Sequence, residues 1–112
     1  MAGILNLQID QGATWTNTIT VYEEDATTAI NLTGYTVAAH MRKNYTSTNK
    51  HIITTTVQNP ATLGKIVMSL TATQTAAITA GYYLYDIEIT SAAGAVTRVM
   101  EGKIQMKPNV TR

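Results

Sequence analysis

The sequence predicts an all-β fold, an antiparallel sandwich or barrel of about seven strands with one short helix. Threonine, valine and isoleucine number 21, 7 and 11 of the 112 residues, so about a third of the chain is β-branched and favours strands. Apolar and polar side chains alternate along most segments, as expected for strands with one buried face. Turn signals separate these segments, and no long helical pattern lies between them.

The length predicts one domain, and the composition excludes several classes of protein and of metal site. A length of 112 residues predicts a single β-sandwich domain over residues 1–112, and 45% hydrophobic content is too high for simple disorder. No apolar run reaches the roughly eighteen residues of a membrane span. The absence of cysteine excludes disulfides and thiolate metal sites. A net charge of +1 with scattered basic residues predicts no nucleic-acid partner and no membrane partner.

Two strands are predicted before residue 22. Leu5, Leu7 and Ile9 alternate with polar residues and indicate a short, half-buried strand. A turn then leads into residues 13–21, where Trp15 shares one face with Ile19 and Val21. The other face of that strand carries four threonines: Thr14, Thr16, Thr18 and Thr20.

Three further strands are predicted in the middle of the chain. Residues 35–42 alternate and are followed by residues 44–50, a polar and irregular segment that we interpret as a long hairpin tip. Residues 52–58 resume the strand pattern and stop at a proline. Ile66, Met68 and Leu70 then mark the buried face of another strand.

One short helix is predicted over residues 71–80. Its alanines and isoleucine have mixed helical spacing, Thr71 or Thr73 can cap its N-terminus, and Gly81 can terminate it.

The last two strands form a predicted hairpin. Residues 82–90 are the strongest strand, with Tyr83, Tyr85, Ile87 and Ile89 on one face, which we expect to be the core. Residues 95–106 return as its partner, with Gly102 as the expected site of a β-bulge. One set of same-face residues is predicted on this strand: Val96, Met100, Ile104 and Met106. Residues 108–112 form an extended C-terminal tail.

No catalytic or cofactor constellation is predicted. His40 and His51 are too few for a zinc site without cysteine, and the spacing of Ser47 and His51 supports no triad. Asp86 and Glu88 project from one strand face, where we expect a solvated surface that pairs with Arg98. We therefore expect no enzyme activity, no cofactor and no bound metal.

Several segments resemble small tailed-bacteriophage virion structural proteins. The resemblance follows the chain in order and rests on six stretches: LNLQIDQGATW from Leu5, NLTGYTV from Asn31, LTATQTAAI from Leu70, GYYLYDIE from Gly81, GAVTRVMEGKI from Gly94 and PNVTR from Pro108. The chain resembles the N-terminal domain of phage baseplate upper proteins and related free-standing virion proteins. The resemblance implies an immunoglobulin-like β-sandwich and membership of the virion, and it implies no active site.

On this resemblance we expect a non-enzymatic, multi-copy adaptor or anchoring subunit of a phage tail, baseplate or fibre. Its partners would be other virion proteins and further copies of the chain, assembled in the host bacterial cytoplasm. Docking is predicted at the N-terminal strand, at the C-terminal tail, at the loop over residues 44–50 and at two tyrosines outside the predicted core. The candidate docking residues are Ile4, Leu5, Leu7, Ile9, Tyr45, Tyr82, Val110, Thr111 and Arg112.

Two alternatives remain open at the level of sequence. A capsid decoration protein is also a small, free-standing β-domain, and it would differ by its copy number in the particle. A carbohydrate-binding adhesin would use Tyr45, Tyr82 and Trp15 as stacking platforms. The strand parity of Trp15 favours the core instead and weakens the adhesin hypothesis.

Overall fold

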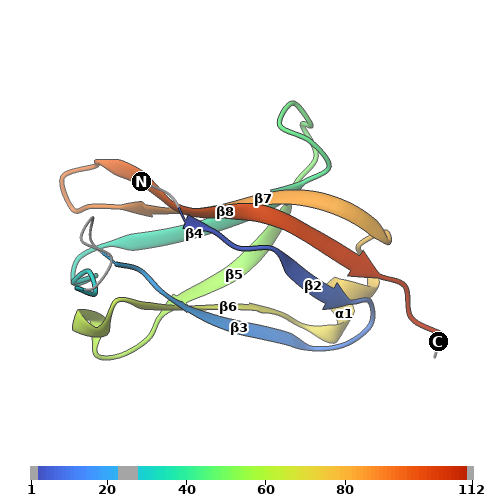
Figure 1. Ribbon diagram of the computed structural model, residues 1–112, viewed down its shortest axis with the longest axis horizontal. Coiled ribbons are helices and arrows are strands. Elements are labelled where there is room, and N and C mark those ends of the chain that lie inside the picture. Colours follow the sequence, from blue (N-terminus) through green and yellow to red (C-terminus); the bar gives the residue numbers. More distant parts are fainter. Residues whose placement is uncertain (1–2, 23–27, 111–112) are drawn as a thin grey trace.

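The computed structural model describes residues 3–22 and 28–110 and shows two packed layers of β-strands (Figure 1). The eight strands of this part of the chain are β1 (Gly3–Ile4), β2 (Leu7–Asp10), β3 (Trp15–Thr20), β4 (Thr36–Arg42), β5 (His51–Val57), β6 (Lys65–Leu70), β7 (Gly81–Thr90) and β8 (Val96–Lys107). Two short helices accompany them, the 3-10 helix η1 (Ala61–Leu63) and the α-helix α1 (Ala72–Ala76).

The strand order confirms the predicted all-β fold. The strands form one curled sheet in the order β1-β8-β7-β4-β5-β6-β3, with β2 also paired to β8. The run β8-β7-β4 and the run β5-β6-β3 correspond to the two facing sheets of an immunoglobulin-like sandwich. The chain therefore buries its apolar residues between two layers.

Strand β5 passes from one layer to the other. Its first half pairs with β4, where Ile53 lies opposite Ala39, and its second half pairs with β6, where Thr54 lies opposite Ser69. The predicted strand over residues 52–58 is thus observed as β5, and it belongs to both layers of the sheet. This crossing curls the sheet into two layers.

The N-terminal strand departs from the predicted antiparallel arrangement. Both β1 and β2 run parallel to β8, with Ile4 opposite Glu101 and Leu7 opposite Ile104. The predicted strand is also divided at Leu5 and Asn6, which raises the number of strands from seven to eight. Alternation of side chains is the same in parallel and antiparallel strands, so the sequence pattern could not distinguish the two.

Gly102 lies beside the break between β1 and β2, and it is not the predicted β-bulge. A Cβ atom at Gly102 would overlap the carbonyl oxygen of Leu5, so only glycine allows the N-terminal segment to lie this close alongside β8. The Leu5 carbonyl accepts a hydrogen bond from the Tyr85 hydroxyl at 2.6 Å, and the Asn6 side-chain oxygen accepts one from the Lys103 N–H at 3.1 Å. These contacts fix the first strands to the last hairpin.

The bulge of the last hairpin lies instead at Val99. Ile87 is opposite Met100, whereas Glu88 is opposite Arg98, so Val99 has no direct partner on β7. The extra residue exchanges the two faces of β8. Val96 is therefore 60% exposed, which corrects its predicted place on the same face as Ile104 and Met106.

The helix is shorter than predicted. It begins after Thr71, whose hydroxyl accepts the Gln74 N–H while the Gln74 side chain accepts the Thr71 N–H, forming a capping box. It ends at Ala76 with Ala77 as its C-cap, so Gly81 is not its terminator and instead opens β7 with a φ of 140°. Thr75 is fully buried and donates to the Ala13 carbonyl at 2.9 Å, which ties the helix to the turn before β3.

The core lies between the two layers and follows the predicted alternation. On β7 the predicted inner residues are all buried: Tyr83, Tyr85, Ile87 and Ile89. They meet Ile66, Met68 and Leu70 from β6 within one cluster of buried side chains. Of the four predicted outer threonines, Thr14 before β3 and Thr16 and Thr18 within it are exposed, and Thr20 is half-buried.

We predict that Gly102→Ala destabilises the domain by at least about 2 kcal/mol, because the new methyl group cannot coexist with the Leu5 carbonyl. Urea unfolding of the purified protein measures this change. The matched control is Gly3→Ala in β1, where the new Cβ would meet only the flexible Met100 side chain, at 3.3 Å. Equal, small effects of the two substitutions would contradict the role given to Gly102.

Candidate docking site

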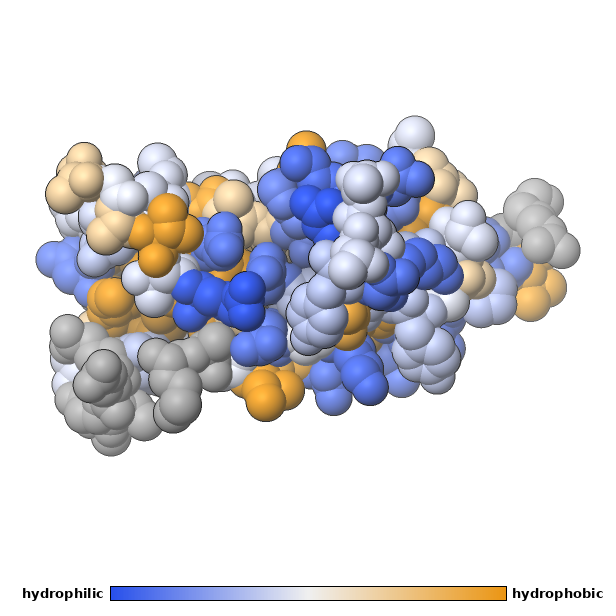
Figure 2. Space-filling model, turned by 90° about the horizontal axis from the view of Figure 1, so that it is seen from above, coloured by the Kyte–Doolittle hydropathy of each residue, from blue (hydrophilic) through white to orange (hydrophobic). Residues whose placement is uncertain are grey.

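The outer face of the layer that contains β7 and β8 carries a row of side chains across five strands. The register places Ile52, His40, Asp86, Glu101 and Ile4 opposite one another in turn, from β5 across β4, β7 and β8 to β1. Directly paired residues point to the same side of a sheet. The row therefore has polar groups in its centre and an exposed isoleucine at each end. Figure 2 looks onto this layer and shows hydrophilic side chains in the middle with hydrophobic ones around them.

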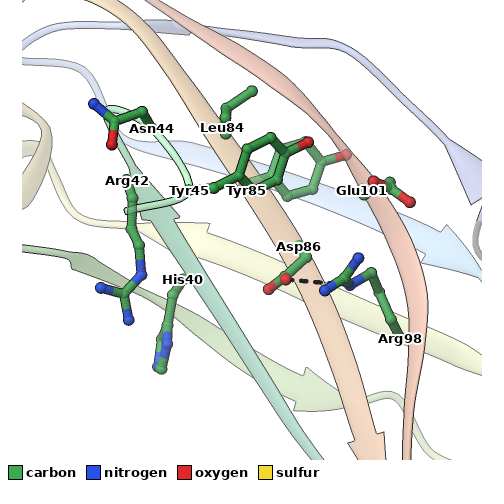
Figure 3. A pocket seen from close by; sticks show the side chains of 9 residues that line it. All are labelled: His40, Arg42, Asn44, Tyr45, Leu84, Tyr85, Asp86, Arg98 and Glu101. Carbon is green, nitrogen blue, oxygen red and sulfur yellow. Dashed lines mark ion pairs between the residues drawn. The ribbon is translucent and has the colours of Figure 1, made fainter. Parts of the chain in front are cut away.

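A small pocket lies in the centre of this face (Figure 3). Its volume is about 180 Å³, and its lining comes from β4, β7, β8 and the loop after β4. The Arg98 guanidinium contacts the Asp86 carboxylate at 3.3 Å, across the last hairpin as predicted. Both side chains are more than a third exposed, so this ion pair contributes little to stability. Arg42 and Glu101 add a second cation and a second anion to the lining.

The loop over residues 43–50 stands above this pocket and has a defined internal structure. The Asn44 side-chain oxygen accepts hydrogen bonds from the Thr46 N–H at 3.1 Å and from the Ser47 hydroxyl at 3.0 Å, which closes an Asx-type turn. The Arg42 guanidinium donates to the Ser47 carbonyl at 2.6 Å. Tyr45 projects from this turn and is 80% exposed, so the loop holds an aromatic side chain out in solvent.

A second hollow of about 440 Å³ lies on the other side of the same loop. Its floor is the Tyr83 ring, with the Lys43 ammonium 4.6 Å from the ring centroid and the His51 ring edge-on at 5.9 Å. The Tyr83 hydroxyl donates to the Thr79 carbonyl at 2.6 Å, and burial raises its pKa. These contacts anchor the base of the hairpin tip to the core.

The structure brings three of the predicted docking residues to this outer face and its loop. Ile4 is 79% exposed, Tyr45 80% and Tyr82 65%. We name Ile4, Ile52, Tyr45 and Tyr82 the docking face. Ile52 was not among the predicted docking residues, because alternation alone does not say which strand end is left uncovered.

The other predicted docking residues lie elsewhere. Leu7 and Ile9 are core residues, because the alternation of β2 turns both side chains inward against the core cluster. Leu5 is half-buried and packs against the same cluster. Val110 is 93% exposed beyond the end of β8, away from the docking face. The last two candidates, Thr111 and Arg112, fall outside the described residues.

The described residues include no metal-binding cluster, and the pocket lining carries charged groups of both signs. Among residues 3–22 and 28–110, no three metal-ligating side chains lie close enough to hold an ion. Arg42 and Arg98 balance Asp86 and Glu101, so the pocket has no strong preference for either sign of charge. In the same ranges no helix is long and apolar enough to cross a membrane.

Comparisons with known proteins add little about function. No protein-family model matches the chain, and no curated protein matches it. Among solved structures the chain is similar to an internalin-like protein of Listeria monocytogenes, with 16% identity and a TM-score of 0.43. The match covers 93% of this chain and 27% of that one. We draw nothing about function from a similarity of this size, and the phage resemblance stays a prediction.

We predict a loss of stability at alkaline pH that depends on Tyr85. Burial raises its pKa to about 12, against an ordinary value near 10, so folding favours the protonated phenol. The stability that the protonated Tyr85 phenol contributes is fully present below about pH 10. It is lost as the pH rises towards 12, which lowers the free energy of unfolding by up to about 3 kcal/mol. Urea midpoints at pH 8 and pH 11.5 measure this loss.

Tyr85→Phe removes the titrating phenol and so loses less stability between the two pH values, although it starts lower because the Leu5 carbonyl loses its donor. Tyr45→Phe, at an exposed tyrosine, serves as the control and behaves like the unmodified protein. A Tyr85→Phe protein with an unchanged alkaline loss would contradict this assignment.

Proposed function

We propose that the chain is a non-enzymatic structural subunit of a bacteriophage virion, an adaptor or anchor of the tail, baseplate or fibre. The sequence resemblance to virion domains supports this proposal because it follows nearly the whole chain. The observed fold agrees with the immunoglobulin-like sandwich that the resemblance implies. The partners would be other virion proteins and further copies of this chain.

The observation that carries the proposal is the docking face. Ile4 and Ile52 are 79% and 63% exposed at opposite ends of one row, and Tyr45 is 80% exposed on the loop above it. Exposed large apolar side chains on one face of a domain supply the area that a partner protein buries. Tyrosine is also enriched at such interfaces. The balanced charges of the centre allow hydrogen bonds that fix the orientation of the partner.

The first test is the location of the protein. Tailed particles produced by the bacterium that carries the gene are purified on a density gradient and analysed by mass spectrometry. We expect the protein in the particle fraction, at a fixed number of copies per particle. Its absence from intact particles would contradict the proposal. A few copies to a few dozen indicates the tail, whereas hundreds indicate the alternative, a capsid decoration protein.

We predict that Ile4→Ser with Ile52→Ser reduces incorporation into particles at least about tenfold, because both substitutions remove apolar area that a partner buries. Incorporation is measured as the amount of protein per particle. The matched control is Leu63→Ser, at an exposed apolar residue of η1 away from the docking face.

Unchanged incorporation of the double serine variant, with its melting temperature preserved, would remove the docking face from the proposal.

Deletion of residues 108–112 tests the tail separately. Unchanged incorporation after the deletion would remove Val110 and the rest of the tail.

A second candidate function is carbohydrate binding. It is favoured by the pocket of about 180 Å³, where Tyr45 lies beside the hydrogen-bonding side chains of Asp86, Arg98 and Glu101. Aromatic rings stack on sugar faces, while charged side chains accept and donate to hydroxyl groups. The partly buried Trp15, which packs against the core from β3, does not contribute to this pocket.

A glycan array tests this candidate. Specific binding that is lost in Tyr45→Ala, and retained in the control Tyr22→Ala at another exposed tyrosine, would support it. If no glycan binds the purified protein, carbohydrate binding is excluded over the range of the array.

A further inference from the structure

Strand β3 is one border of the sheet and lies at the lower edge of the second layer in Figure 1. It pairs with β6 along one side only, from Trp15 opposite Leu70 to Thr20 opposite Lys65. Within residues 3–22 and 28–110, no strand pairs with its other side. A sheet edge of this kind presents unpaired backbone groups to any strand that approaches.

The hydrogen-bond pattern shows which backbone groups face outward. In an antiparallel ladder, opposite residues alternate between pairs that exchange backbone hydrogen bonds and pairs that do not. The Val21 N–H donates to the Gly64 carbonyl at 2.8 Å, one step beyond the pair Thr20–Lys65. Hydrogen-bonded pairs recur at every second residue, so the odd-numbered residues of β3 form backbone hydrogen bonds with β6. The backbone groups of Thr16, Thr18 and Thr20 therefore point away from β6.

The other side of β6 leads to the same conclusion. The Gln58 N–H donates to the Lys65 carbonyl at 2.9 Å, and Thr56 lies opposite Val67 two residues further along. Lys65, Val67 and Ser69 thus direct their backbone groups towards β5. These three residues are the partners of Thr20, Thr18 and Thr16 on β3, so the three threonines are free to bond on the open side.

Within the part of the chain that the structure describes, the open side of β3 has none of the usual protections of a sheet edge. Natural edges are blocked by charged residues, proline, bulges or short strands. The six residues of β3 include no charge and no proline, and their register with β6 is regular throughout. The opposite border differs, because it is divided into β1 and β2 at Leu5 and Asn6 and carries Asp10.

We propose that a second copy of this chain pairs with β3, antiparallel and about a twofold axis at Thr18. In this register Thr18 lies opposite Thr18 of the second copy, and Thr16 lies opposite Thr20. Every outward N–H and carbonyl of the three threonines then finds a partner. The threonine side chains meet on the outer face, which is a favourable cross-strand pair.

The inner face and the net charge also suit self-pairing. The same register brings Trp15 opposite Val21 of the second copy, so apolar side chains meet next to the core of each copy. A net charge of +1 gives little repulsion between two copies. Two sheets would join into one continuous sheet, which is an isologous and closed interface. This inference does not depend on the virion role.

The test uses the purified chain in sedimentation over a range of concentrations. We expect the apparent mass to rise from 12.1 kDa towards twice that value. Thr18→Lys places two ammonium groups opposite each other and weakens the dimer by at least about tenfold. Thr54→Lys is the matched control, because it makes the same change at an exposed threonine of the same layer, on β5 inside the sheet.

A single cysteine tests the register, since the chain has no cysteine of its own. Opposite hydrogen-bonded residues have Cα atoms about 5.5 Å apart, within the range of about 4.4–6.8 Å that a disulfide spans. Thr18→Cys should form a disulfide dimer under mild oxidation much faster than Thr54→Cys. A mass of 12.1 kDa at every concentration, or equal oxidation rates of the two cysteine variants, would overturn the proposal. Because no virion protein is needed, either result leaves the virion hypothesis to its own test.

Discussion

The two-residue alternation of β7 is the constraint on which the rest of the structure depends. This strand lies between β4 and β8, and it sends Tyr83, Tyr85, Ile87 and Ile89 into the core. The same alternation sends Leu84, Asp86 and Glu88 to the outer face, because successive side chains of a strand point to opposite sides. Because the inward side chains of β7 must be buried, its alternate side chains must lie on the outer face. The pocket of the docking face is a consequence of how the core is packed.

Two local irregularities adapt the neighbours of β7 to this pattern. The bulge at Val99 exchanges the faces of β8 and so places Arg98 beside Asp86 on the outer face. Gly102 leaves room for the Leu5 carbonyl, which the buried Tyr85 hydroxyl then holds at 2.6 Å. One irregularity shapes the surface and the other attaches the N-terminal segment. Both lie on β8, next to β7.

The two proposed contact surfaces lie on different layers and use different physics. The docking face offers exposed apolar and aromatic side chains around a polar centre, and a partner would bind it mainly by burying area. The edge of β3 offers backbone hydrogen bonds on three threonines, and a strand of the right geometry would bind it by extending the sheet. A subunit with both could pair with its own copy and still hold a different partner.

The sequence by itself determined the all-β class, the faces of most strands, the buried tyrosines of β7 and the exposed threonines of β3. These features follow from local alternation, which each segment carries within its own few residues. Tertiary structure alone decided that the N-terminal strand runs parallel to β8 and that β5 belongs to both layers. It also decided that Gly102 marks a close approach and Val99 the bulge. The reason is that strand direction, partner and crossing points depend on contacts between residues far apart in the chain, and alternation contains no information about them.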